Sequence, residues 1–457
     1  MIKIYDTMTR SLQDFIPLNE GKVNMYVCGP TVYNYIHIGN ARSVVAFDTI
    51  RRYFEYCGYQ VNYISNFTDV DDKIIKGAAE AGMDTKSFSD KFISAFMEDV
   101  AALGVKPATK NPRVIDYMDE IIDFVKVLVD KEFAYEANGD VYFRVSKSHH
   151  YAKLANKTLE DLEIGASGRV DGEGEIKENP LDFALWKSAK SGEVSWESPW
   201  GKGRPGWHIE CSVMATEILG DTIDIHGGGA DLEFPHHTNE IAQSEAKTGK
   251  TFANYWMHNG FVNVDNEKMS KSLGNFITVH DMLKSVDGQV IRFFLATQQY
   301  RKPVNFTEKA VHDAEVNLKY LKNTFNLPIQ ENANDEELEQ FVKAFQEAMD
   351  DDFNTADAVT VLFELSKDIN TNITVNSSKE LATKALELMR ELGGPLGILQ
   401  KSTKGDLESE IEELIEQRQN ARKNRDFALA DKIRDDLKAR GIVLEDTPQG
   451  VRWKKVN

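Results

Sequence analysis

The chain has 457 residues, too many for one ordinary domain, and with 41% hydrophobic and 28% charged residues it has the composition of a globular protein that folds in water. Its net charge of −19, from 54 basic and 73 acidic residues, excludes a protein that binds nucleic acid over its whole surface. It also lacks an apolar run of about 20 residues and a basic–apolar leader, so we expect neither a membrane span nor a secretory signal.

The first part of the chain predicts a strand, a helix and a second strand. The apolar run KVNMYVCGP (22–30) ends in Gly-Pro, which is typical of a buried strand followed by a turn. From Asn40, which we expect to be the N-cap, apolar residues keep helical spacing as far as Gly58, and the run VNYISNF (61–67) follows. Such units build parallel sheets that bind ligands at the carboxyl ends of their strands. We therefore predict an α/β, Rossmann-like domain whose first half spans residues 1–110.

The middle of the chain interrupts this pattern and then resumes it. Residues 111–203 combine helical stretches with a segment rich in Gly, Trp and Pro, which predicts an insertion into the α/β domain. DTIDIHGGGADLEF then returns to a strand and a glycine loop, followed by a helix that carries His236 and His237. Residues 204–265 are thus predicted to form the second half of the domain.

The last third of the chain is predicted to be mainly helical. After a segment of residues 266–305, further helices starting near Leu338, Thr355 and Glu380 make residues 306–400 a helical bundle. The apolar stripe of its first helix consists of Val311, Ala314, Leu318, Leu321 and Phe325. Beyond a linker at 398–410, residues 401–457 predict a small mixed α/β domain with basic helices and a strand pair. From Arg418 onward it holds eleven basic and six acidic residues, so a local patch could still receive a polyanion.

Cysteine, histidine and glutamate residues of the two half-domains form a candidate metal site. His236 and Glu240 are four residues apart, so on a helix they share one face. Zinc takes four ligands, and Cys28 and Cys211 would meet this pair at the carboxyl rim of the sheet. His237, three residues from Glu240, is an alternative to His236. The competing interpretation is two small buried thiols and a surface contact between histidine and glutamate.

Other interpretations of these residues are less favoured. Cys57, at a helix end, is expected to be inert, and three widely spaced cysteines favour a reducing cytoplasm over a disulfide framework. The order His-x-x-x-Glu does not match the His-Glu-x-x-His motif of zinc peptidases. The HGGG stretch would suit the oxyanion loop of an esterase, but the required Gly-x-Ser-x-Gly elbow is missing.

Three segments are suited to a phosphorylated ligand. His37 and Asn40 stand at a predicted helix start, where free N–H groups and a positive dipole end attract phosphate. The glycine loop that contains Gly228 would let a ligand approach the backbone closely. NEKMSKSLGN places Lys268 and Lys271 in a basic loop that could close on a polyphosphate, although most such loops are only solvated.

Together these segments resemble the class I aminoacyl-tRNA synthetases. HIGN (37–40) stands at the place of the class's His-Ile-Gly-His signature, with Asn40 replacing the second histidine, and KMSKS (268–272) matches the second signature in full. Over essentially the whole chain, the sequence is similar to the cysteinyl-tRNA synthetases in the stretches MYVCGPTVYNYIHIGNAR, NFTDVDDKII, GRPGWHIECS, DIHGGGADLEFPHHTNEIAQSE and DDDFNTADA.

The resemblance implies a cysteine–tRNA ligase that activates cysteine with ATP and transfers it to the terminal adenosine of tRNA(Cys). It implies one zinc ion, bound to the substrate thiolate, which rejects serine, and ATP bound with Mg²⁺. The implied zinc ligands are Cys28, Cys211, His236 and Glu240. The implied catalytic residues are His37, Asn40, Lys268 and Lys271. The implied ATP contacts are His37, Asn40, Gly228, Asp231 and Lys271, with Lys271 the main one. Thr68, Trp207 and Asp231 are expected to line the amino-acid or ribose pocket.

The same resemblance assigns roles to the rest of the chain. Residues 266–305 would contact the tRNA stem, the helical bundle would dock the tRNA, and the tail would bind the anticodon. The expected phosphate contacts in the tail are Arg422, Lys423, Arg425 and Lys432. We expect a monomer in the cytoplasm. We also expect no editing domain, because a zinc ion that binds the substrate thiol can distinguish cysteine from serine without editing. The alternatives are a related cysteine ligase that acts on an amino-sugar and a zinc-bearing relative without catalysis, which Asn40 would favour.

Overall fold

The computed structural model describes residues 1–148, 150–158, 176–269, 274–326, 338–373, 379–400, 427–439, 441–447 and 450–455, with short helical pieces between 411 and 422. These residues form two compact units, Met1–Leu399 and Gln400–Asn457. The predicted linker residues 401–410, together with Lys271, Lys423 and Arg425, lie outside the described residues.

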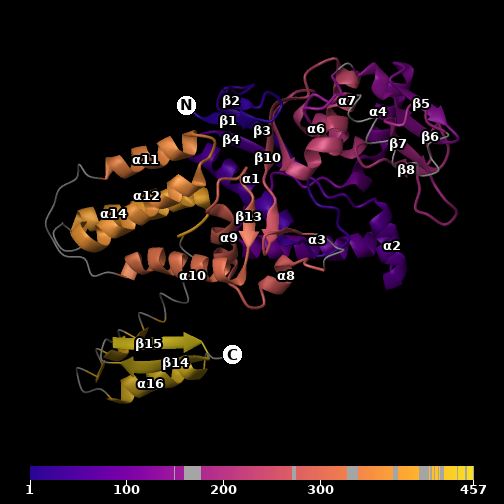
Figure 1. Ribbon diagram of the computed structural model, residues 1–457. Helices are drawn as coiled ribbons and strands as arrows, with labels where there is room; N and C mark the ends of the chain where they lie inside the picture. Colours follow the sequence, from indigo (N-terminus) through magenta and orange to yellow (C-terminus); the bar gives the residue numbers. More distant parts are fainter. Residues whose placement is uncertain are drawn as a thin grey trace. The chain divides into compact units, whose positions relative to one another are not determined.

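A four-stranded parallel sheet forms the centre of the first unit (Figure 1). In spatial order its strands are β10 (Ala253–Asn259), β9 (Ile223–Gly229), β3 (Lys22–Val27) and β4 (Gln60–Ser65). Helix α1 (Ile38–Tyr56) connects β3 to β4, which confirms the predicted strand–helix–strand unit. The chain leaves β3 towards β4 on one side and returns as β9 on the other. At such a switch point the carboxyl ends of neighbouring strands open a crevice for ligands.

The glycines of HGGG are part of strand β9 and not of a loop, which corrects the prediction. A Cβ atom on Gly227 would lie 2.3 Å from Cε1 of Phe47, a buried residue of α1. The glycine therefore allows α1 to pack closely on the sheet, and its presence reflects packing between helix and strand.

Three helices and a second sheet separate the halves of the α/β fold. Helices α2 (Asp72–Ala81) and α3 (Thr85–Ala102) follow β4, and α4 (Met118–Asp130) packs beside an antiparallel sheet. The strands of this sheet, in order, are β5 (Ala134–Ala137), β6 (Asp140–Phe143), β7 (Phe183–Ser188) and β8 (Gly203–Pro205). The sheet lies where the insertion was predicted and continues to Pro205. At the N-terminus, β1 (Lys3–Asp6) and β2 (Ser11–Asp14) form a hairpin.

The chain re-enters the parallel fold through α6 (Ile209–Leu219) and, after β9, through α7 (Thr238–Thr248). His236 and His237 lie in the π-helical turn Glu233–His237, which leads directly into α7, so they lie on a helical segment as predicted, just ahead of the regular α-helix. Phe234 has extended backbone angles, φ −142° and ψ 132°, which separates the turn from a regular helix.

A small sheet and a helical bundle complete the first unit. The sheet has the order β12 (Glu267–Lys268), β11 (Val262–Val264) and β13 (Val304–Phe306), and α8 (Val279–Met282) and α9 (Gly288–Ala296) lie between β12 and β13 in the chain. The bundle helices are α10 (Glu308–Asn323), α11 (Glu339–Asp350), α12 (Thr355–Asp368) and α14 (Lys379–Leu396). The predicted stripe on α10 is buried at Val311, Ala314, Leu318 and Leu321, and half-buried Phe325 follows it.

A buried arginine, Arg292, joins the bundle to the α/β domain. Arg292 on α9 has no exposed surface, donates to the carbonyl of Leu396 (2.8 Å) and forms an ion pair with Asp48 of α1 (2.6 Å). Burial alone would raise the pKa of Asp48, but Arg292 and Arg52 lower it below its ordinary value. Arg292 therefore ties Asp48 of α1 to the end of bundle helix α14.

The second unit is small. Helix α16 (Phe427–Ala439) packs on the hairpin of β14 (Ile442–Thr447) and β15 (Gly450–Lys455), as expected for a mixed α/β domain. Its apolar cluster consists of Ile411, Ile415, Ile433, Leu437 and Ile442. Throughout the described part of the chain, every helix falls short of the length and hydropathy that a bilayer crossing requires.

Candidate active site

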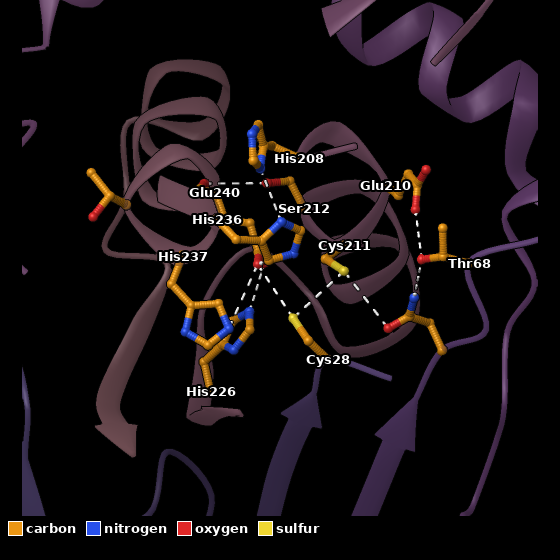
Figure 2. Close-up of polar contacts among 12 residues, drawn as sticks. Cys28, Thr68, His208, Glu210, Cys211, Ser212, His226, His236, His237 and Glu240 are labelled. Carbon is orange, nitrogen blue, oxygen red and sulfur yellow. Dashed lines mark hydrogen bonds and ion pairs between the residues drawn. The ribbon is translucent and has the colours of Figure 1, made fainter. Parts of the chain in front are cut away.

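Four side chains converge at the carboxyl ends of β3 and β9 (Figure 2). Cys28 follows β3, Cys211 lies in the first turn of α6, and His236 and Glu240 flank the start of α7. The Sγ atoms of the two cysteines are 3.6 Å apart, and the Sγ of Cys28 is 3.4 Å from Oε1 of Glu240. Nε2 of His236 is 3.0 Å from the same oxygen. The structure therefore brings together all four predicted ligands.

The donor set fits zinc. Tetrahedral zinc with bonds of about 2.0–2.3 Å holds its ligand atoms roughly 3.3–3.8 Å apart, and all four donor atoms here lie within 4.8 Å of one another. Cys211, His236 and Glu240 are almost completely buried. The hydrogen bond from Cys28 lowers the pKa of the Cys211 thiol to about 6, which favours the thiolate that a metal needs.

Histidines behind the cluster orient its carboxylate. Nε2 of His226, on β9, is 2.6 Å from Oε2 of Glu240, so the two carboxylate oxygens face different partners. Nδ1 of His208 is 2.9 Å from Nδ1 of His236. Such outer contacts fix the orientation of metal ligands. Sequence reasoning missed His226 and His208, although five of the ten histidines fall between His208 and His258.

His237, the alternative ligand, lies farther from the shared oxygen. Its Nε2 is 4.0 Å from Oε1 of Glu240, and its Nδ1 is 2.7 Å from Nε2 of His258. A second combination of Cys28, His226, His237 and Glu240 also lies within 4.8 Å. The shorter contact of His236 and its approach to both Cys211 and Glu240 favour the first combination.

A cavity of about 770 Å³ opens beside the cluster, a size typical of small-molecule sites. The residues predicted from the sequence that line it are Cys28, His37, Asn40, Thr68, Trp207, Cys211, Asp231, His236 and Lys268. Glu240 lies behind them. Gly228 is not among the described lining residues, whereas its neighbour Gly229 is, because Gly228 packs against Leu232 and His237.

His37, and not Asn40, is the N-cap of α1. Nδ1 of His37 accepts the main-chain N–H of Asn40 (3.2 Å), and Oδ1 of Asn40 accepts the N–H of His37 (3.3 Å). This reciprocal cap moves the helix start to Ile38. Because Nδ1 accepts a hydrogen bond, the proton of the neutral ring is on Nε2.

The residues after the second signature contact the first signature. The main-chain N–H of Ile38 donates to Ile277 (2.9 Å), that of Val279 donates to Ile36 (2.9 Å), and the ring of Phe276 stands edge-on to His37 with 5.1 Å between centroids. Lys268, at the start of the second signature, contacts the Phe261 ring at 5.0 Å. Residues 276–279, which follow the second signature, thus lie beside the start of α1.

A buried polar chain runs behind the cavity wall (Figure 2). Thr68 donates to Oε2 of Glu210 (2.9 Å) and accepts from Nδ2 of Asn66 (3.3 Å), whose Oδ1 accepts the N–H of Gly29 (3.0 Å). Burial raises the pKa of Glu210 well above its ordinary value. Glu210 and Asn66 were not predicted, because neither belongs to a motif whose chemistry is visible in one sequence.

Comparison with known proteins gives three family matches. Residues 14–316 match the class I (C) tRNA synthetase catalytic domain, residues 344–400 match the DALR domain, and residues 404–453 match the cysteinyl-tRNA ligase anticodon binding domain.

Similar proteins cover the whole chain. A cysteine–tRNA ligase of Streptococcus agalactiae serotype III is 88% identical over 455 residues, and one of Streptococcus thermophilus is 74% identical over 455 residues; each match covers 100% of both chains. Among solved structures, Mycobacterium tuberculosis methionyl-tRNA synthetase in complex with methionyl-adenylate superposes with a TM-score of 0.61 at 14% identity. That match covers 82% of this chain and 91% of the other, which supports the fold alone.

Proposed function

The chain belongs to the cysteine–tRNA ligases, which join cysteine to tRNA with ATP, and from this premise we propose that its cluster of two cysteines, one histidine and one glutamate holds one zinc ion. The ligands would be Cys28, Cys211, His236 and Glu240. The observation that carries the proposal is the meeting of four such donors, three of which line the cavity. A bound zinc would coordinate the substrate thiol, lower its pKa and leave serine without an equivalent ligand at neutral pH.

We propose that ATP, bound with Mg²⁺, lies at the start of α1. The Nε2–H of His37, the amide of Asn40 and the ammonium group of Lys268 would donate to its phosphates at a positive helix end. Lys271 belongs to the same proposal through its signature. The carboxylate of cysteine would attack the α-phosphate and release pyrophosphate, which gives cysteinyl-adenylate. A ribose hydroxyl of tRNA would then attack the cysteinyl carbonyl, and AMP would leave. The protein's task is to position these groups and stabilise charge.

Residues on the cavity wall between the two groups would hold the amino acid and the ribose. Trp207 lies over His236, with 4.6 Å between ring centroids, and Thr68 presents a hydroxyl that is already oriented from behind. Asp231 offers a carboxylate to the substrate ammonium group or to a ribose hydroxyl. Gly228 would act indirectly, by letting β9 lie close to the turn that carries His237.

The rest of the chain would bind tRNA. We propose that residues 1–110 and 204–265 are the two halves of the catalytic domain, with 111–203 inserted between them. Residues 266–305 would contact the stem, 306–400 would dock the tRNA and 401–457 would bind the anticodon, with phosphate contacts from exposed residues such as Arg422 and Lys432. A monomer in the cytoplasm, without an editing domain, remains part of the proposal.

Cysteine-dependent ATP–pyrophosphate exchange tests the proposed activation step. Purified protein should exchange pyrophosphate with cysteine about 10⁴-fold more efficiently than with serine, because only the thiol can bind zinc. Exchange should disappear after removal of the metal and return with added zinc.

Charging of tRNA then distinguishes the ligase from the amino-sugar alternative, which the anticodon-binding match already disfavours. Cysteine exchange that is unchanged in metal-free protein would contradict the zinc proposal. Absence of exchange from folded, zinc-loaded protein would favour the non-catalytic alternative.

A further inference from the structure

Asp352 lies in the turn between bundle helices α11 and α12, far from the metal cluster in the chain, and its carboxylate is buried and saturated with donors. Its Oδ1 accepts the main-chain N–H of Tyr5 (2.8 Å) and the hydroxyl of Tyr300 (2.9 Å). Its Oδ2 accepts from Gln299 (2.9 Å) and from Nε of Arg301 (2.6 Å). Asp352 is only 3% exposed, and the donors Gln299 and Tyr300 are also buried, so without the carboxylate these two side chains would lack both their acceptor and water to replace it.

Three of these donors belong to one turn, residues 298–302, which follows α9. Buried Arg42 of α1 contacts the same turn, because its Nη2 donates to the carbonyls of Gln299 (3.0 Å) and Lys302 (3.3 Å). The hydroxyl of Thr355 also donates to the carbonyl of Gln298 in this turn (3.1 Å). The turn is therefore placed by the bundle and by α1 together.

The turn 298–302 also contacts one wall of the cavity. The N–H of Gly260, which lines the cavity, donates to the carbonyl of Tyr300 (2.8 Å). A Cβ on Gly260 would lie 2.5 Å from the carbonyl oxygen of Arg301, so the two backbones are in close contact. Only glycine allows this approach.

The strand that follows the turn belongs to the small sheet from which the basic loop starts. Strand β13 begins at Val304, whose N–H donates to the carbonyl of Phe261 (2.9 Å), and pairs with β11, which pairs with β12. Lys268 ends β12 and lines the cavity together with Phe261. The cysteine-side residues Cys28 and Cys211 are carried by β3 and α6, which make none of these contacts with Asp352.

We propose that Asp352 is a positioning residue for the ATP side of the cavity: by holding the turn 298–302, it sets the position of Gly260, Phe261 and Lys268. This inference rests on the proposed placement of ATP. It predicts an asymmetric defect, in which loss of the carboxylate weakens the use of ATP and leaves the use of cysteine unchanged.

The Asp352→Asn variant tests the proposal in tRNA-independent exchange. Asn tolerates the left-handed backbone of this residue (φ +53°), but its single oxygen cannot accept from donors on both sides. We expect the KM for ATP to rise about tenfold, as for loss of one hydrogen bond to a charged group, with the KM for cysteine within about twofold of the parent. Asp351→Asn, the same change at the exposed neighbour, is the matched control and should behave as the parent.

The Tyr300→Phe variant keeps the carboxylate and removes one donor, so it carries the test if Asp352→Asn does not fold. Here we expect the KM for ATP to rise about threefold, the effect of one ordinary hydrogen bond, again without a matching change for cysteine. Equal increases in both KM values, or parental values in the folded variant, would overturn the proposal. Absence of exchange in the parent protein would instead contradict the proposed function itself.

Discussion

The Cys211→Ser variant is expected to lose its bound zinc and, with it, the preference for cysteine over serine. Serine has nearly the same shape, but its hydroxyl is not deprotonated at neutral pH and is a poor zinc ligand. The three remaining donors would hold the ion weakly. Without zinc, the cavity offers cysteine little more than it offers serine, so exchange with cysteine should fall by about 10⁴-fold, towards the serine level.

Two measurements on the same preparation check this result: zinc content per chain and the exchange rates with both amino acids. Cys57→Ser is the matched control, because Cys57 is an exposed thiol at the end of α1. That variant should keep one zinc ion and full exchange. A Cys211→Ser protein that retained zinc and discrimination would show that another combination, such as the one with His226 and His237, holds the metal.

The His37→Ala variant is expected to lower kcat/KM for ATP in the exchange reaction by about 10²-fold, the size of effect seen when one preorganised donor to developing charge is removed. The same change removes the side chain that caps α1, so the protein should also lose about 1 kcal/mol of stability. Thermal unfolding and exchange kinetics measure the two effects separately.

The His37→Asn variant separates capping from catalysis. Asparagine is a good N-cap residue, so it should restore the stability lost in His37→Ala. It lacks the imidazole N–H that we place against the phosphates, and exchange should stay low. Recovery of exchange together with stability would mean that His37 acts only as the cap of α1.

Sequence motifs identified the chemistry of this protein well because each motif joins residue types that few other functions combine. HIGN and KMSKS, in order and on a predicted strand–helix–strand unit, led to the correct class, and the matched domains confirm it. Helical periodicity located the bundle, since a buried stripe such as Val311, Ala314 and Leu318 reflects only local geometry.

Local signals were wrong at two positions, the N-cap of α1 and the glycines of HGGG. Asparagine is a residue type favoured at N-caps, which made Asn40 the expected cap. The extended backbone of His37, however, lets its ring accept the Asn40 N–H, and the helix starts at Ile38. The glycines of HGGG suggested a ligand loop, whereas Gly227 lies in a strand and accommodates Phe47 of α1. The contact of Gly227 with Phe47 lies outside its motif, whereas the cap joins two residues of HIGN that are both able to fill the N-cap position.

The amino-acid sequence by itself therefore determined the class of fold and the two signatures, which depend on residue type and short-range spacing, and the family resemblance that these carry pointed to the four candidate ligands. Only the tertiary structure decided which groups stand behind them: His226 on the Glu240 carboxylate, Glu210 behind Thr68, and Asp352 behind the wall of the cavity. Each of these contacts joins residues from separate elements. Their distances follow from the packing of strands and helices, which one sequence does not display.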